Sequence, residues 1–182
     1  MNSEIAALLR RGTVIPAHPL ALDARRQLDE RRQRAIARYY LDAGSGGLAV
    51  GVHATQFAIR DAGLYEKVLR LAIEQGLSWV KRPVVMIAGL AGKTAQAKKE
   101  AVVARSLGYH CGMLSLGAMK GASIDELVEH CAAVADEMPL IGFYLQTAVG
   151  GIRLPMEFWQ RFASIENVVA IKIAPFNRYA TL

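Results

Sequence analysis

The stretch "PVVMIAGLAGKTAQAKKEAVVARSLGYHCGML", residues 83–114, holds the pattern on which the predicted fold depends. A short apolar run over 84–88 is followed by a helix-forming segment over 94–107 and by a second apolar run over 110–114. A strand, a helix and a strand at this spacing are typical of a βαβ unit, in which the two strands are parallel.

The same alternation runs along most of the chain. The apolar runs begin roughly 30 residues apart, which is the length of one βα unit. Gly44, Gly76 and Gly108 follow predicted helices, where a left-handed residue is favoured. The predicted strands are 13–17, 47–51, 84–88, 110–114, 140–144 and 168–173, and the predicted helices are 24–43, 61–75, 94–107, 123–136 and 155–162.

Small and large side chains alternate in two of these strands. In 47–51 the alternate residues are glycine and alanine, and in 170–174 they are two alanines and Lys172. Small residues suit a narrow lumen and bulky ones an outer ring of helices, so we favour a barrel over a doubly wound sheet. The predicted fold class is α/β, a (β/α)8 TIM barrel. A complete barrel has about 250 residues, so we expect residues 1–182 to be a single domain, a C-terminally truncated barrel of about the first six βα units.

The composition is that of a globular protein, with 53% hydrophobic and 21% charged residues among 182. No apolar run approaches the roughly 20 residues of a membrane span, and the first residues lack a signal-peptide pattern. Cys111 and Cys131 have neither disulfide-framework nor metal-site spacing. We therefore expect a cytoplasmic protein with reduced thiols, no metal and no membrane partner.

The net charge is +6, and much of the excess lies in "DARRQLDERRQRAIARYY", residues 23–40. Glu30 and Arg34 stand four residues apart, as in a solvated helix face with ion pairs. No aromatic-interleaved basic motif accompanies the charges, so we expect no nucleic-acid partner. A positive field also suits a small anionic substrate.

Lys172 interrupts the apolar run "VVAIKIA", residues 168–174, which is predicted to be buried on both faces. An amine nucleophile must be neutral, and a lysine with a pKa of about 10.4 is almost entirely charged at pH 7. Desolvation in an apolar strand lowers the pKa and suits a lysine for Schiff-base formation with a carbonyl. The alternative is a structural lysine, either paired with a carboxylate or reaching solvent.

Tyr144 stands at the carboxyl end of the preceding predicted strand. We expect Tyr144 and Lys172 to point inward together at the carboxyl ends of adjacent strands, where barrel enzymes carry their chemistry. A phenol in this position can transfer protons. The alternative is a core tyrosine bonded to backbone.

Five segments together resemble the dihydrodipicolinate synthase / N-acetylneuraminate lyase family of class I aldolase-type (β/α)8 barrels. The segments are "GTVIPAHPLAL" (12–22), "LDAGSGGLAVGVHAT" (41–55), "PVVMIAGLAGKTAQA" (83–97), "IGFY" (141–144) and "NVVAIKIA" (167–174). The resemblance implies that Lys172 forms an imine with a 2-oxo acid such as pyruvate and that Tyr144 relays protons. It implies a lyase that makes or breaks a carbon–carbon bond with an aldehyde, in a homo-oligomer (dimer or tetramer). No cofactor or metal is required, because the protonated imine is itself the electron sink.

The chain departs from the family pattern in two loops. Members commonly carry Gly-Thr-Thr-Gly-Glu after the second strand, whereas this chain reads "GVHATQ" (51–56), so His53 and Thr55 are the candidate substrate-binding residues there. For His53, a histidine that merely closes the strand end is the alternative. After Tyr144, we expect the turn at Gly150 and Gly151 to help hold the carboxylate of the substrate.

These departures leave other functions open. A dehydratase or decarboxylating enzyme on the same scaffold is one alternative, and the two substituted loops are what would select it. A catalytically silent binding or regulatory homologue is the other.

Overall fold

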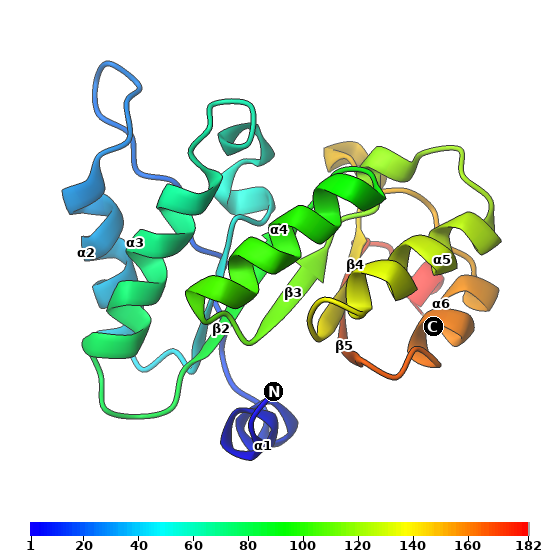
Figure 1. The fold of residues 1–182 in the computed structure, drawn as a ribbon, viewed down its shortest axis with the longest axis horizontal. Coiled ribbons are helices and arrows are strands. Elements are labelled where there is room, and N and C mark those ends of the chain that lie inside the picture. Colours follow the sequence, from blue (N-terminus) through cyan, green and yellow to red (C-terminus); the bar gives the residue numbers. More distant parts are fainter. Residues whose placement is uncertain (182) are drawn as a thin grey trace. The chain divides into compact units, whose positions relative to one another are not determined.

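The computed structural model describes residues 1–181 and contains one five-stranded sheet, with strand order β1-β2-β3-β4-β5 (Figure 1). The pairs β1–β2, β3–β4 and β4–β5 are parallel, which confirms the predicted α/β class. The strands are β1 (Gly47–Val50), β2 (Val85–Leu90), β3 (Cys111–Leu114), β4 (Leu140–Leu145) and β5 (Val168–Ala174), and the α-helices are α1 (Ser3–Arg11), α2 (Glu30–Asp42), α3 (Tyr65–Ser78), α4 (Thr94–Leu107), α5 (Ile124–Ala135), α6 (Met156–Ala163) and α7 (Arg178–Thr181). Four single-turn 3-10 helices, η1 (His53–Thr55), η2 (Phe57–Ile59), η3 (Gly117–Met119) and η4 (Thr147–Val149), lie in the loops that follow strands.

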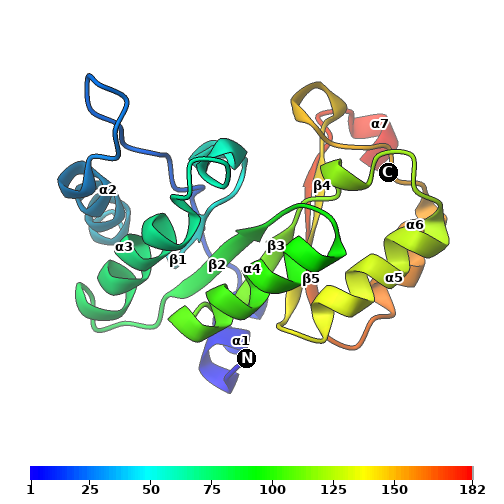
Figure 2. The ribbon, with the colours of Figure 1, turned by 45° about the horizontal axis from the view of Figure 1, so that its top comes forward.

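The chain divides into two compact units. The first unit comprises Met1–Gly89 and Val103–Cys111, and the second comprises Leu90–Val102 and Gly112–Leu182. In the first unit α2 packs beside α3, and both contact β1 (Figure 2). In the second unit α5 packs beside α6, and β4 pairs with β5 along its length.

Close helix–strand packing builds a core in each unit. Gly76 lies inside α3, and not after its end as predicted, because its missing side chain makes room for Met86 of β2. In the second unit Phe158 and Phe162 of α6 are fully buried, and Phe162 packs against Gly142 of β4. Burial of one phenylalanine side chain contributes about 1.5–3 kcal/mol.

The predicted first strand, 13–17, is not a strand, although its backbone runs beside β1. The N–H of Gly46 donates to Val14, and the N–H of Ala49 donates to Pro16. Only Ala17 forms a bridge, with Ala49. Pro16 has no N–H to donate, which limits this segment to isolated contacts. The sheet therefore has five strands among the described residues where six were predicted.

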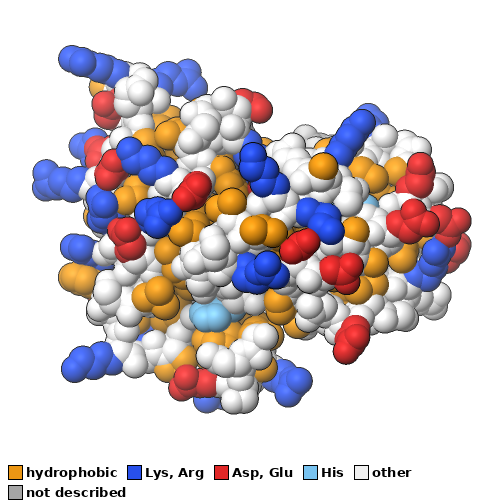
Figure 3. Space-filling model, in the orientation of Figure 1, with side chains coloured by type: hydrophobic (Ala, Val, Ile, Leu, Met, Phe, Trp, Pro, Cys, Tyr) orange, Lys and Arg blue, Asp and Glu red, His pale blue; other side chains and the backbone are white. Residues whose placement is uncertain are grey.

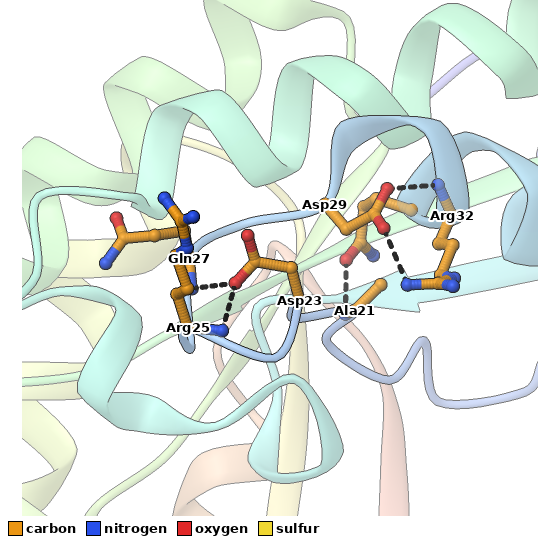
Figure 4. Close-up of polar contacts among 7 residues, drawn as sticks. Ala21, Asp23, Arg25, Gln27, Asp29 and Arg32 are labelled. Atoms are coloured by element: carbon orange, nitrogen blue, oxygen red, sulfur yellow. Dashed lines mark hydrogen bonds and ion pairs between the residues drawn. The ribbon is translucent and has the colours of Figure 1, made fainter.

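The predicted helix 24–43 begins six residues later in the structure, at Glu30. The carboxylate of Asp23 accepts hydrogen bonds from the N–H groups of Arg25 (2.8 Å) and Gln27 (2.9 Å), which holds this segment in a turn (Figure 4). Asp29 then caps α2 by accepting from the N–H of Arg32 at 2.9 Å. Aspartate competes for backbone N–H groups in this way, so the helical pattern of the sequence does not extend through it.

Three of the other predicted helices, α4, α5 and α6, lie within one residue of their expected bounds, whereas α3 begins four residues and ends three residues later than the predicted 61–75. Helix α4 has the predicted bounds, and α5 begins after Ser123, whose side chain forms a capping box with Glu126. Gly44 and Gly108 have φ angles of 89° and 96°, as expected for residues that follow helices. Helices α1 and α7 were not predicted.

Basic side chains gather over α2 and the loop before it on the face drawn in Figure 3, with acidic side chains among them. Lys67 lies 2.7 Å from Glu30, and Arg34 lies 3.3 Å from the same carboxylate. These pairs fit the solvated helix face that the sequence predicts. Within residues 1–181, no helix is long and apolar enough to cross a membrane. Cys111 and Cys131 are buried and free.

His18 is a fully buried histidine in the first unit. The amide nitrogen of Gln33 donates to Pro19 at 3.0 Å and lies 2.8 Å from Nδ1 of His18, while its oxygen accepts from the N–H of Ala21 at 2.7 Å. These contacts fix the amide orientation, so Nδ1 of His18 is an acceptor and the imidazole is neutral. Burial lowers the pKa of His18 to about 4.

The first unit should therefore lose stability in acid. His18 binds its proton more readily in the unfolded chain, where its pKa is about 6.5. The contribution of neutral His18 to the free energy of unfolding is therefore complete above that pH and falls as the pH drops toward 4. We expect a loss of about 3 kcal/mol of unfolding free energy over this range. Urea unfolding at several pH values measures it. His18→Gln should flatten the pH dependence, whereas His53→Gln, at an exposed position, should not; equal slopes for wild type and His18→Gln would contradict the assignment.

Candidate active site

Lys172 lies on β5, the last strand of the sheet. Its Cα is the register partner of Phe143 on β4, and register partners in a parallel pair project from the same face. The ammonium nitrogen lies 4.9 Å from the centre of the Phe143 ring. Phe143 is itself buried. The lysine amine therefore lies against an apolar aromatic wall.

The expectation that this strand is buried on both faces is wrong. Its five central residues are exposed, and Ile173 is 56% exposed. The reason is its place in the sheet, because β5 pairs with β4 alone among the described residues. Lys172 as a whole is exposed, yet partial desolvation of its ammonium group still lowers the pKa of Lys172 below the ordinary value. A lowered pKa increases the fraction of lysine that is a neutral amine at a given pH.

Tyr144 projects from the opposite face, which corrects the prediction that it points inward with Lys172. Its register partner is Ile173, and its ring lies 5.3 Å from that of Trp159 on α6. Gly142, two residues earlier on the same face, also packs against α6. Tyr144 therefore faces the helix layer, and Phe143 occupies the position beside the lysine.

A register shift explains this difference. Leu140 pairs with Val168, but the next residue, Ile141, pairs with Ala170, so β5 carries one extra residue at Val169. Without the shift Tyr144 would be the partner of Lys172. A slip of one residue turns each later side chain to the other face of the sheet. Sequence alternation alone does not reveal such a bulge.

The N–H groups of the turn after β4 donate to carbonyl groups of the same turn. The N–H of Gly150 donates to Thr147 (3.3 Å), and the N–H of Gly151 donates to Gln146 (3.0 Å). A Cβ at Gly151 would overlap the carbonyl oxygen of Leu145. Both glycines thus have a structural reason to be there, and the predicted carboxylate contact by their N–H groups would require these hydrogen bonds to open.

Thr55 and His53 belong to the first unit, and η1 carries both. Thr55 is fully buried; its hydroxyl donates to the carbonyl of His18 at 2.6 Å and accepts from the N–H of Gly51 at 2.9 Å. This hydroxyl holds the turn after β1, so its predicted contact with substrate gains no support. His53 is exposed and packs against Phe57, with ring centroids 6.0 Å apart. Its substrate contact stays a prediction.

The family assignment now rests on direct comparison. The sequence model of the dihydrodipicolinate synthetase family matches residues 11–180. The chain belongs to this family. No curated protein matches the chain significantly.

Several solved structures have a similar fold. An N-acetylneuraminate lyase from Mycoplasma synoviae has a TM-score of 0.77 at 14% identity, with 93% of this chain and 56% of that chain covered. A dihydrodipicolinate synthase from Aquifex aeolicus has a TM-score of 0.80 at 20% identity, with 92% and 57% covered. A putative dihydrodipicolinate synthetase from Pseudomonas aeruginosa has a TM-score of 0.78 at 20% identity, with 88% and 55% covered. This chain therefore spans a little over half the length of these neighbours and has the corresponding part of their TIM-barrel fold.

Gly151 provides a test of the turn that follows β4. Gly151→Ala should destabilise the protein by about 1–3 kcal/mol, because the new methyl group meets a backbone carbonyl that cannot move aside. Gly150→Ala is the matched control: its Cβ meets no atom within 4 Å, and only its left-handed φ of 93° adds about 1–2 kcal/mol. Urea unfolding compares the two. A smaller loss for Gly151→Ala than for Gly150→Ala would contradict the described packing.

Proposed function

We propose that this member of the dihydrodipicolinate synthetase family is a Schiff-base lyase of the class I aldolase type, with Lys172 as the imine-forming residue and a 2-oxo acid such as pyruvate as substrate. The observation that carries the proposal is the lysine beside Phe143, with a lowered pKa, at the position where the family resemblance implies the imine. The family match over residues 11–180 supports the reaction class.

The chemistry follows from the amine. The neutral nitrogen of Lys172 adds to the keto carbon of the 2-oxo acid, and the adduct takes up one proton and loses water to give a protonated imine. When the neighbouring carbon loses a proton, the protonated imine accepts the electron pair of that C–H bond and an enamine forms. The enamine carbon is a nucleophile toward an aldehyde, and cleavage runs the same steps in reverse. The protein must keep part of the amine neutral, and the apolar surroundings of Lys172 act in that direction.

Borohydride trapping tests the imine directly. The protein is incubated with pyruvate and borohydride, and peptide mass spectrometry locates the reduced adduct. We expect the adduct on Lys172 and its absence in Lys172→Ala, with Lys120→Ala, at an exposed lysine, labelled as the wild type is. Because the neutral amine reacts, labelling at Lys172 should rise with pH and reach half its maximum below about 10.4. A folded protein without an adduct for any 2-oxo acid tested would contradict the proposal.

A second function, a catalytically silent binding or regulatory homologue, is favoured by one observation. Tyr144 faces α6 and not the lysine, so the proton relay implied by the family resemblance has no phenol beside Lys172 in this structure. An imine can form without this relay, whereas proton removal from the adjacent carbon would be slow. The decarboxylating and dehydratase alternatives require the same imine and remain proposals. We also propose a cytoplasmic location, a single domain that is a truncated barrel, and a homo-oligomer.

The Tyr144→Phe variant distinguishes a catalytic role of Tyr144 from a packing role. If Tyr144 packs only on the helix side, its removal should change deuterium exchange at the methyl group of pyruvate less than about threefold, because the phenol does not reach the imine. A general acid–base role predicts a loss of about 10²-fold or more. Nuclear magnetic resonance of pyruvate in deuterated buffer measures the exchange rate. The borohydride adduct serves as the control, since it should form in both proteins.

A further inference from the structure

The face of the sheet that carries Lys172 is apolar in the second unit. Three register pairs of β4 and β5 make up this face, because alternate residues of a strand project to the same side. The pairs are Ile141 with Ala170, Phe143 with Lys172 and Leu145 with Ala174. The three β4 residues are buried, and Met113 of β3, the partner of Ile141, adds a fourth buried apolar side chain. Among the described residues of β4 and β5, Lys172 is thus the only ionisable one on this face.

The other ionisable residue of these two strands lies on the opposite face. Tyr144 packs its ring 5.3 Å from that of Trp159 on α6. Phe143 stands beside the lysine instead, with 4.9 Å between the centre of its ring and the ammonium nitrogen, and it has no group that exchanges a proton. In the part of β4 and β5 that the structure describes, no acid or base therefore stands beside the amine.

This arrangement affects the two reactions of an imine unequally. An imine of a 2-oxo acid can lose either a proton or CO2 from the carbon next to the former keto group. Loss of the proton requires a base, and a positioned base accelerates such a step by about 10²–10⁴-fold. Loss of CO2 requires no base, because the carbon–carbon bond to the carboxylate breaks and its electron pair passes into the protonated imine. An amine without a neighbouring base therefore favours the second reaction.

The apolar face favours loss of CO2 for a second reason. This step converts a carboxylate and a protonated imine, both charged, into CO2 and an enamine, both neutral. Apolar surroundings disfavour charged groups, and the buried ring of Phe143 provides such surroundings beside the amine. Lys172 is exposed on its other side, so water reaches the enamine.

We propose that Lys172 catalyses the decarboxylation of a 2-oxo acid that bears a second carboxylate on the carbon next to the keto group. The proposal rests on the imine of the proposed function and names a substrate class and a reaction for it. The geometry that supports it is the apolar face around Lys172, with Phe143 and no proton-transfer group beside the amine.

The steps balance without a cofactor. The neutral amine adds to the keto carbon, and the adduct takes up one proton and loses water to give the protonated imine. The bond to the second carboxylate breaks, CO2 leaves, and the electron pair forms the enamine. Water gives a proton to the enamine carbon. Hydrolysis of the resulting protonated imine releases the shortened 2-oxo acid, one proton and the neutral amine.

CO2 release from oxaloacetate tests the proposal. Divalent metal ions also polarise the keto group, so the assay contains a chelator and the rate in buffer alone is subtracted. We expect release above the buffer rate in the wild type, and in Lys120→Ala at an exposed lysine of the same unit. Lys172→Ala and Lys172→Arg should both fall to the buffer rate, because neither forms an imine. Wild-type protein at the buffer rate would overturn the proposal.

The Phe143→Tyr variant tests the role of the missing base. In the wild type, CO2 release from oxaloacetate should be at least about tenfold faster than deuterium exchange at the methyl group of pyruvate, because only the exchange needs a base. The variant adds a hydroxyl to the ring beside the amine and should raise the ratio of exchange to CO2 release at least about tenfold. An unchanged ratio, or exchange faster than CO2 release in the wild type, would contradict the proposal.

Borohydride trapping with pyruvate separates this proposal from the lyase. An adduct on Lys172 in a protein that releases no CO2 from oxaloacetate would overturn the decarboxylation and leave the proposed lyase standing. A folded protein with neither an adduct nor CO2 release would count against the imine itself, and so against both.

Discussion

The register between β4 and β5 is the constraint on which the candidate site depends. One extra residue at Val169 shifts the pairing, so that Phe143 and Lys172 become partners and Tyr144 turns to α6. Hydrogen bonds along the two strands fix this choice, and every later side chain follows it. A single bulge thus decides whether the lysine has a phenol or an apolar ring beside it.

The amine of Lys172 lies beside the Phe143 ring, although the strand that carries it is exposed. The sequence places Lys172 in an apolar run, which led to the expectation of a fully buried strand. In the structure β5 is exposed, and the desolvation that lowers the pKa of Lys172 acts on a side chain beside the buried Phe143. Phe143 precedes Tyr144 in the chain and carries no polar group, so its contact with the lysine could be found only from strand register.

Much of the fold could be predicted from the sequence, because local signals fix it. Apolar runs and capping residues such as Ser123 place the helices and strands to within a few residues. Where prediction failed, a specific contact overrode the pattern: the side chain of Asp23 delays α2, Pro16 limits pairing beside β1, and Met86 requires Gly76 inside α3. These effects depend on which atoms meet, and residue periodicity does not encode that.

The site was predictable in part. Lys172 stands out as a charge in an apolar strand, and the family resemblance implies a role for it. The binding residues in the loops were harder, because their chemistry depends on whether a donor is already used. The hydroxyl of Thr55 is already engaged within the protein, by the carbonyl of His18 and the N–H of Gly51.

The central claim is that the surroundings of Lys172 favour its neutral amine. The most direct measurement is a nuclear magnetic resonance titration of the protein with ¹³C at the lysine ε-carbons, in which Lys172→Arg assigns the signal. We predict a pKa for Lys172 below the value of about 10.4 that an unperturbed lysine has. A pKa at or above that value, in the folded protein, would contradict the account and return Lys172 to a structural role.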